Sequence, residues 1–149
     1  PTLKDGSHTI SVKASDNDGN AAAAKTATFT VDTVPPTLQI TAPSNDLITN
    51  KKTVTVSGKT DDVSSKPVTV TVNGATATVG TDGTFTKDVT LAEGANTITI
   101  VAKDKAGKTT TVTRKVTVDT SAPVIKSVTL TPNPVDCGKT FIIAVEITD

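Results

Sequence analysis

The chain has 149 residues, with 15 basic and 15 acidic side chains that give no net charge at pH 7. This balance excludes the basic footprint of a nucleic-acid-binding protein, and no apolar run approaches the ~20 residues of a membrane-spanning helix. The chain contains three phenylalanines and neither tryptophan nor tyrosine. Catalytic pockets are usually lined in part by aromatic side chains, so this composition disfavours an enzyme.

The composition predicts β-structure. Threonine occupies 32 of the 149 positions, and valine is also abundant. Both residues are β-branched and suit the half-buried surface of a sheet. No segment shows a helical period, and the alanine run at 21–24 is interpreted as strand or loop because its counterpart later in the chain has the pattern of a strand. We therefore expect an all-β protein with no α-helix of note.

Residues 1–33 contain strand-like runs on either side of a polar turn. The turn is Asp16-Asn17-Asp18-Gly19-Asn20, and carboxylate and amide oxygens are the ligands that calcium prefers. Asp16 and Asp18 are therefore candidate calcium ligands, although the turn lacks the distal glutamate of a complete EF-hand loop and its counterpart at 104–108 is unsuited to a metal. The simpler interpretation is a turn in which Asp, Asn and Gly supply local hydrogen bonds and positive φ angles.

A short joint follows each of two Thr-rich segments. The joints are Asp32-Thr33-Val34-Pro35-Pro36 and Asp119-Thr120-Ser121-Ala122-Pro123. A new apolar run begins after each joint, and proline makes such linkers semi-rigid. We interpret the joints as boundaries between repeated modules.

Residues 34–120 have the pattern of seven or eight short strands, which is typical of a β-sandwich. Asn73-Gly74 is the strongest hairpin signal, because both turn positions need positive φ. The adjacent carboxylates Asp61 and Asp62 are interpreted as part of a solvated loop. Strands are expected at 37–41, 53–58, 67–72, 75–79, 84–89, 96–103 and 109–119, with core side chains at Val54, Val56, Phe85, Ile98, Ile100, Ala102, Val112, Val116 and Val118.

The chain repeats itself with a period of about 87 residues. Pro36 corresponds to Pro123 at an offset of 87, and residues 3–16 correspond to residues 91–104 at an offset of 88. These offsets predict that residues 1–33 are the C-terminal half of one module, 34–120 a complete module, and 121–149 the N-terminal half of a following module. The end segments lack most of their own sheets, so we expect only the central copy to fold autonomously.

Several motifs resemble those of bacterial immunoglobulin-like modules that occur in tandem on surface proteins and adhesins, and most of all the type of module named after glucodextranase domain B. In chain order they are Val72-Asn73-Gly74, Asp82-Gly83-Thr84-Phe85, the stretches 91–98 and 102–107, and the Asp-Thr-x-x-Pro joints. The resemblance implies an immunoglobulin-like β-sandwich. The stretch 127–135 also resembles the opening strand of such modules in Gram-positive surface proteins and phage tail proteins.

The resemblance implies a second calcium option. Some adhesin arrays of this kind look stiffened by Ca²⁺ bound at the aspartate of the linker. The matching positions are Asp32 and Asp119, with help from Asp61, Asp62 or a neighbouring loop. The alternative is an ordinary linker stiffened by proline, and no other cofactor is expected.

We expect a non-catalytic spacer or adhesive segment of a large exported bacterial surface protein, located outside the cell. Its partners would be neighbouring immunoglobulin-like modules of the same chain, and a cell-surface protein or carbohydrate, with no nucleic acid and no membrane insertion. Two alternatives stay open, namely a domain of a phage tail or baseplate in a virion, and an accessory module of a secreted glycoside hydrolase. The open half-modules also allow strand-complemented self-association. The single cysteine, Cys137, has no intrachain partner for a disulfide.

Overall fold

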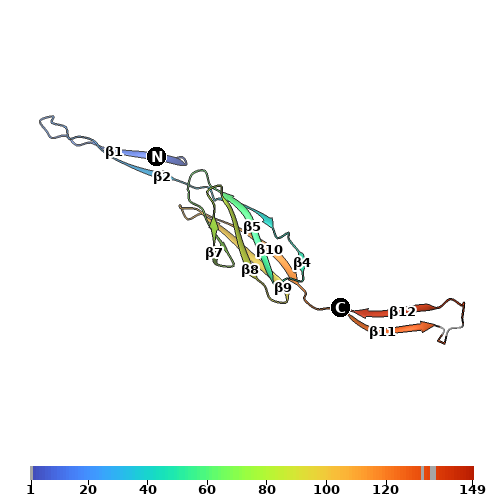
Figure 1. Ribbon diagram of the computed structural model, residues 1–149. Helices are drawn as coiled ribbons and strands as arrows, with labels where there is room; N and C mark the ends of the chain where they lie inside the picture. Colours follow the sequence, from blue (N-terminus) through green and yellow to red (C-terminus); the bar gives the residue numbers. More distant parts are fainter. Residues whose placement is uncertain (1, 132, 135–136) are drawn as a thin grey trace.

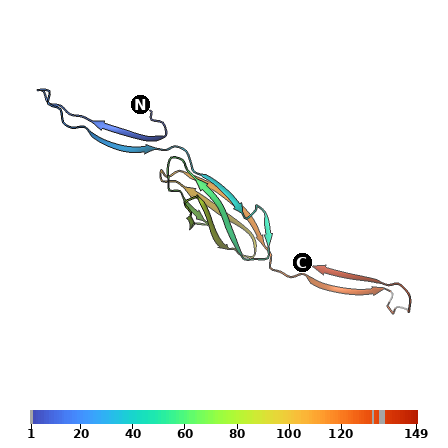
Figure 2. The same cartoon turned by 45° about the horizontal axis from the view of Figure 1, so that its top comes forward.

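The computed structural model describes residues 2–131, 133–134 and 137–149. Regular structure in these residues is entirely β-strand and forms three sheets, which are a hairpin, an eight-stranded sandwich and a second hairpin (Figures 1 and 2). The predicted all-β fold is confirmed. The described residues contain no helix that is long and apolar enough to span a bilayer. Positions 132 and 135 of the stretch 127–135 lie outside the described residues.

The central sandwich has two layers. One layer contains β3, β5 and β8, the other contains β4, β10, β9 and β6, and β7 pairs with β8 at one end and with β6 at the other. The chain changes layer between β3 and β4, because β4 pairs in parallel with β10. The strands are β3 (Thr37–Ala42), β4 (Leu47–Thr49), β5 (Thr53–Asp61), β6 (Thr69–Val72), β7 (Ala75–Val79), β8 (Thr84–Thr90), β9 (Gly94–Lys103) and β10 (Thr109–Val118).

The core between the layers is aliphatic. Strand alternation places one face of each strand inward, and Val56 and Ile98 are fully buried. The predicted core positions are confirmed except for Val112, which is only half-buried. The one aromatic ring of this core, Phe85, packs so closely against Gly58 that a Cβ atom on the glycine would lie 2.9 Å from the ring. Only glycine therefore fits this site on β5.

The predicted hairpin and all seven predicted strands are present, with strand ends that differ by up to three residues. Asn73 and Gly74 both have positive φ and join β6 to β7. The Asn73 carboxamide oxygen also accepts a hydrogen bond of 2.8 Å from the Thr99 amide on β9. The sequence analysis missed β4, a three-residue strand whose partner is about 70 residues away in the chain.

The two end hairpins repeat the pairing of strands in the sandwich. Strands β1 (Gly6–Val12) and β2 (Lys25–Val31) pair with Gly6 opposite Val31, and β9 and β10 pair with Gly94 opposite Val118. Gly6 corresponds to Gly94 at the repeat offset of 88 residues, and Val31 corresponds to Val118 at the offset of 87. Strands β11 (Val124–Thr131) and β12 (Ile142–Thr148) correspond to β3 and β5, and a one-residue bulge occurs in the first strand of each pair. The hairpins thus reproduce the pairing of opposite layers of the sandwich, except that the bulge of β11 lies two repeat positions earlier than that of β3. The module boundaries themselves stay a prediction.

Candidate metal centre at the first joint

The first joint begins with Asp32, directly after β2. One carboxylate oxygen of Asp32 accepts a hydrogen bond of 3.2 Å from the Val34 amide, which turns the chain toward the sandwich. The next residue, Thr33, faces the preceding hairpin, where its hydroxyl donates to both oxygens of Asp5 at 2.9 and 3.0 Å. Thr33 is therefore bonded to the preceding hairpin, whereas the hydrogen bond of Asp32 stays within the joint.

Asp62 comes directly after β5, at the end of the sandwich that receives the joint. It is only 6% exposed, so the sequence-based interpretation of a solvated loop holds for Asp61 alone. The Asp62 Oδ1 atom accepts hydrogen bonds from the Ser64 and Ser65 amides at 2.8 and 2.7 Å. These bonds fold the loop over the carboxylate and offset the cost of its burial.

Asp104 comes directly after β9, in a tight turn that closes at Gly107. It is 5% exposed, and its Oδ1 atom accepts a hydrogen bond of 2.8 Å from the Lys108 amide. This turn is attached to the Asp62 loop, because the Ala106 amide donates to the Ser65 hydroxyl at 2.9 Å. The two loops hold Asp62 and Asp104 side by side.

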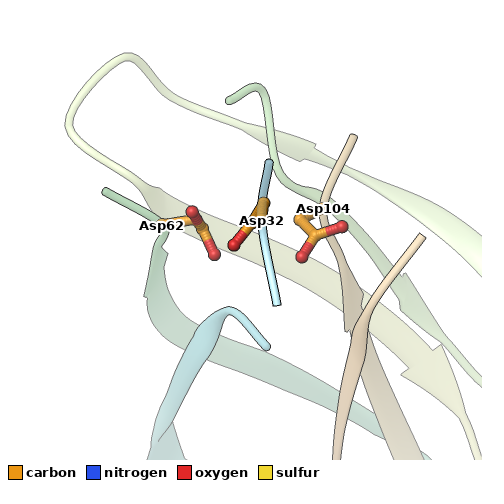
Figure 3. Close-up of side chains that lie close together, drawn as sticks. All are labelled: Asp32, Asp62 and Asp104. Atoms are coloured by element: carbon orange, nitrogen blue, oxygen red, sulfur yellow. The ribbon is translucent and has the colours of Figure 1, made fainter. Parts of the chain in front are cut away.

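The three carboxylates converge at the entrance to the sandwich. One oxygen from each of Asp32, Asp62 and Asp104 lies within 4.8 Å of the other two, and Figure 3 shows Asp32 between its two partners. The Oδ2 atoms of Asp32 and Asp104 are buried and have no hydrogen-bond partner. Three negative charges at this spacing repel one another, and buried acceptors without a donor are costly. A bound cation would offset the repulsion between the carboxylates and would also give the two unpaired oxygens a partner.

The residues present fit a hard divalent cation. Calcium takes six to eight oxygens at about 2.3–2.6 Å, so two oxygens up to 4.8 Å apart are able to share one ion. The cluster offers carboxylates only, a ligand set that suits Ca²⁺ or Mg²⁺ rather than zinc. Lys66 and Lys105 line a depression together with Asp32. In the described part of the chain, however, the ion pairs are Lys66 with Asp61 and Lys52 with Glu93, and neither neutralises the cluster.

The fold separates the four metal ligands that the sequence predicted. Asp32 enters the cluster. Asp16 and Asp18 lie in the exposed turn between β1 and β2, where both Asp16 oxygens accept hydrogen bonds, at 2.8 Å from the Asn20 amide and 2.8 Å from its side chain. These bonds, with the Asn20 side chain first, hold the pKa of the Asp16 carboxyl below its usual value. Asp119 is exposed, and no cluster of three metal-ligating side chains includes it among the described residues.

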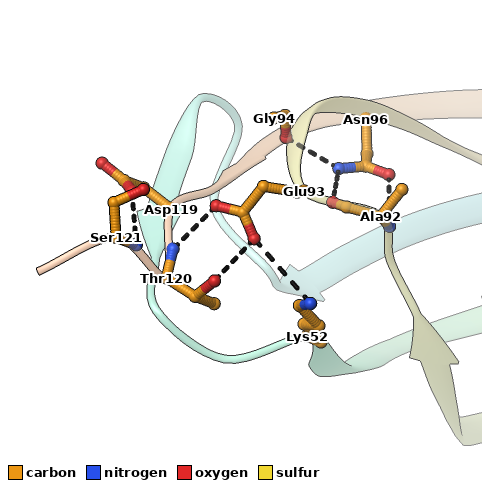
Figure 4. Close-up of polar contacts among 8 residues, drawn as sticks. All are labelled: Lys52, Ala92, Glu93, Gly94, Asn96, Asp119, Thr120 and Ser121. Atoms are coloured by element: carbon orange, nitrogen blue, oxygen red, sulfur yellow. Dashed lines mark hydrogen bonds and ion pairs between the residues drawn. The ribbon is translucent and has the colours of Figure 1, made fainter.

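The second joint has a related anchor, shown in Figure 4. Glu93 accepts hydrogen bonds from the Thr120 amide at 2.8 Å and from its hydroxyl at 2.7 Å, and Lys52 lies 4.0 Å away. Glu93 and Thr120 stand at the repeat positions of Asp5 and Thr33, so both joints are bonded to the unit that precedes them. These contacts, the Thr120 amide first, lower the pKa of the Glu93 carboxyl.

Sequence reasoning assigned no ligand to Asp104, because its own turn offers a single carboxylate. The signal lay in the repeats. Asp104 corresponds to Asp16 at an offset of 88, and Asp32 and Asp62 correspond to Asp119 and Asp149 at 87. Every member of the cluster thus has an aspartate in the other copy. Tracing these pairs together would have singled out the three positions before the fold was known.

A second hollow in the sandwich has no comparable chemistry. It is an open groove lined by residues 59–61, 66–68 and 79–83. Its carboxylates are satisfied, Asp61 by the Lys66 ammonium at 2.9 Å and Asp82 by the Thr84 hydroxyl at 2.7 Å. These same contacts hold the pKa of each carboxyl below its usual value. Both carboxylates of the groove are therefore already bonded within the sandwich.

Two solved structures that resemble the chain are described as modules or tandem repeats. Fibronectin(III)-like modules of CbhA from Clostridium thermocellum are 21% identical with a TM-score of 0.46, over 78% of this chain and 64% of that one. A tetra-tandem repeat in the extending region of a large adhesion protein is 25% identical with a TM-score of 0.48, over 97% of this chain and 46% of that one. The chain thus spans less than two thirds of the length of either structure. No curated protein matches the chain.

The match to a family model identifies the family of the chain, which the two solved structures do not. The family model for glucodextranase domain B matches residues 36–120, from the end of the first joint through the whole sandwich to the second joint. The match covers more than half of the 149 residues. The chain therefore belongs to the glucodextranase domain B family of non-catalytic, immunoglobulin-like modules.

Proposed function

We propose that this chain is a spacer segment of an exported bacterial surface protein, and that a calcium ion bound by Asp32, Asp62 and Asp104 stiffens its first joint. The observation that carries the proposal is the convergence of three carboxylates, two of which are almost completely buried, at the entrance to the sandwich. One carboxylate comes from the joint and two from the module that follows. An ion held by all three would fix the joint to that module.

The mechanism is geometric. A module of this family holds no catalytic group, and its contribution to a larger protein is length and direction. With the joint free, successive modules sample many orientations. With Asp32 attached to the following module and Thr33 bonded to the preceding hairpin, few backbone torsions remain free between the two. Calcium outside the cell would then favour an extended array that holds a distal binding site away from the surface.

The test is an ¹⁵N relaxation measurement on the 149-residue chain, with calcium and with a chelator. In calcium, we expect the β1–β2 hairpin to tumble with the sandwich, and in the chelator we expect it to move independently on the nanosecond timescale. The β11–β12 hairpin is the internal control. Among the described residues no cluster of three metal-ligating side chains includes Asp119, so the motion of this hairpin should not respond to calcium.

Two results would contradict the proposal. The first is a calcium titration that changes neither the chemical shifts around Asp32, Asp62 and Asp104 nor the melting temperature of the sandwich. This result would show that the cluster does not bind calcium. The second is calcium binding that leaves the motion of the β1–β2 hairpin unchanged, which would leave a metal site without a role in stiffness.

The family match also favours a second candidate, an accessory module of a secreted glycoside hydrolase. Sugar rings usually stack on aromatic side chains. The chain has neither tryptophan nor tyrosine, and the phenylalanine of the sandwich, Phe85, is 3% exposed. We therefore favour a spacer over a carbohydrate-binding role for this segment. Binding of the chain to an insoluble α-glucan in a pull-down experiment would reverse that preference.

A further inference from the structure

The first and last strands of the sandwich lie side by side. β3 and β10 contact each other, and β4, which follows β3 in the chain, pairs in parallel with the C-terminal end of β10. The chain enters β3 from the first joint and leaves β10 at the second, and Figures 1 and 2 show these joints at opposite ends of the sandwich. Tension between the joints would therefore pull β3 and β10 in opposite directions along their length.

Side chains of β10 bond to the backbone at both ends of β3. The Thr110 hydroxyl donates to the Pro36 carbonyl at 2.5 Å. Four residues further along β10, the Arg114 Nε atom donates to the Pro43 carbonyl at 3.2 Å, and its Nη2 atom lies 3.5 Å from the Ile40 carbonyl oxygen. The order of these contacts is the same in both segments, so β3 and β10 run in the same direction.

Arg114 is an unexpected residue for its place on β10. It is the only arginine of the chain, and strand alternation puts it on the same face as the buried Val116 and Val118. It belongs to neither of the ion pairs found in the described residues, so backbone carbonyls alone hold its half-buried charge. An apolar side chain would fill this position at a lower cost of desolvation. What the arginine adds is its attachment to the β3 segment.

Backbone contacts continue this row where β4 takes over from β3. In the loop before β4, the Asn45 side-chain oxygen accepts a hydrogen bond of 3.0 Å from the Lys115 amide. β4 then pairs with β10 over three residues, and the Asp119 amide extends the pairing with a bond of 2.9 Å to the Thr49 carbonyl. The contacts are spaced along the direction of the pull and join the same two segments. Tension would therefore load them together rather than one after another.

We propose that these contacts form a mechanical clamp that sets the force at which the sandwich unfolds. The clamp consists of the side chains of Thr110 and Arg114, the bond between Asn45 and Lys115, and the pairing of β4 with β10. The proposal rests on the proposed spacer function, because only a module that transmits tension has a use for such a clamp. It is independent of the metal, since no member of the acidic cluster belongs to the clamp.

The test is to stretch the 149-residue chain by its two ends in optical tweezers, with a chelator present. Unfolding of the sandwich is recognised by the length that it releases, which is at most about 300 Å for residues 36–120. Unfolding under force is governed by the unfolding rate rather than by equilibrium stability. The rate at constant force is therefore the quantity to compare between variants, beside the stability of each variant in urea without force.

Arg114→Met keeps an unbranched side chain in the half-buried position and removes every donor to the β3 segment. We expect this variant to unfold about ten times faster than the unmodified chain at the same force, with little change in its urea midpoint. Thr110→Val keeps the β-branched shape and removes only the hydroxyl bond to Pro36. It should also unfold faster under force, by a smaller factor because the lost bond is uncharged.

Asn73→Ala is the matched control. It removes the bond from the Thr99 amide at the β6–β7 turn, in the middle of the chain and outside the clamp. This variant should lose more stability in urea than Arg114→Met, yet its unfolding rate under force should stay close to that of the unmodified chain.

Either of two observations would overturn the clamp. In the first, Arg114→Met and Thr110→Val both unfold under force at the rate of the unmodified chain. In the second, Asn73→Ala accelerates forced unfolding as much as they do, so that force reports only the overall stability. Both measurements are made without free calcium, so neither result bears on the metal site. A failed calcium titration would in turn contradict the proposed stiffening of the joint and leave the clamp as it is.

Discussion

Replacement of Asp104 by asparagine is the sharpest test of the acidic cluster. The change keeps the shape of the side chain and removes one negative charge. It also supplies an amide donor beside Asp32 and Asp62, whose carboxylate oxygens lie within 4.8 Å of that of Asp104. We expect the variant to be more stable than the natural chain in a chelator, and to lose the stabilisation that calcium gives.

The magnitude follows from the spacing. At 4.8 Å and an effective dielectric constant of about 20, two unit charges repel by about 3.5 kcal/mol. Asp104→Asn removes two of the three repulsive pairs, and solvent screening at the half-buried Asp32 reduces the sum, so we expect a gain of about 2–4 kcal/mol without metal. For the 87-residue repeat unit that corresponds to a melting temperature higher by about 10 °C or more. Calcium at 100 times its dissociation constant should stabilise the natural chain by about 2.7 kcal/mol.

The assay is thermal unfolding followed by far-ultraviolet circular dichroism or calorimetry, because the chain has no tryptophan or tyrosine to report by fluorescence. Asp16→Asn is the control, since Asp16 is the repeat equivalent of Asp104 but is exposed and fully hydrogen-bonded. The hydrogen bond that it loses lies in the β1–β2 turn, so the melting of the sandwich in chelator and its response to calcium should both stay unchanged. An Asp104→Asn variant that is less stable than the natural chain in chelator, with an unchanged calcium response, would refute the reasoning.

Three further predictions concern the sandwich and the second joint. Gly58→Ala should destabilise the sandwich by about 1–3 kcal/mol in urea unfolding, because the added Cβ collides with the Gln39 backbone carbonyl on β3 and with the Phe85 ring; a smaller change would mean that the strands separate easily. Asn73→Ala should cost about 1–2 kcal/mol in the same assay, since alanine disfavours positive φ and loses the bond to β9. Glu93 has a lowered pKa when folded, so its stabilising bonds to Thr120 are present above the unfolded pKa near 4.5 and are lost as the pH falls through the folded value. The Thr120 amide resonance should titrate below pH 4.5, and Glu93→Gln should abolish that titration.

The sandwich was predictable because its signals are local. Alternation of valine, isoleucine and threonine fixes which face of each strand is buried, and Asn73-Gly74 fixes the register of one hairpin. Strand β4 gave no such signal. Leu47 to Thr49 is too short for alternation to be visible, and its pairing with β10 depends on a partner about 70 residues further along the chain.

The candidate site was only partly predictable, because no local pattern contains it. Asp32, Asp62 and Asp104 come from three segments that are 30 and 42 residues apart, and the fold alone brings them together. Asp16 and Asp18 were predicted as ligands because they are close in sequence, but both Asp16 oxygens already accept hydrogen bonds within the turn, and Asp18 is exposed. Asp62 was interpreted as solvated, since nothing near it indicates that Ser64 and Ser65 fold over it.

The order of attachments at the joint has a mechanical consequence. Asp32 faces the module that follows it, and Thr33, one residue later, is bonded to the hairpin that precedes it. With a cation in the cluster, the two attachments would overlap along the chain, and no free residues would remain between them. A tether built from such joints would have little entropic elasticity. Under tension we expect it to transmit force almost without slack, and to lengthen only when a cluster or a whole sandwich breaks.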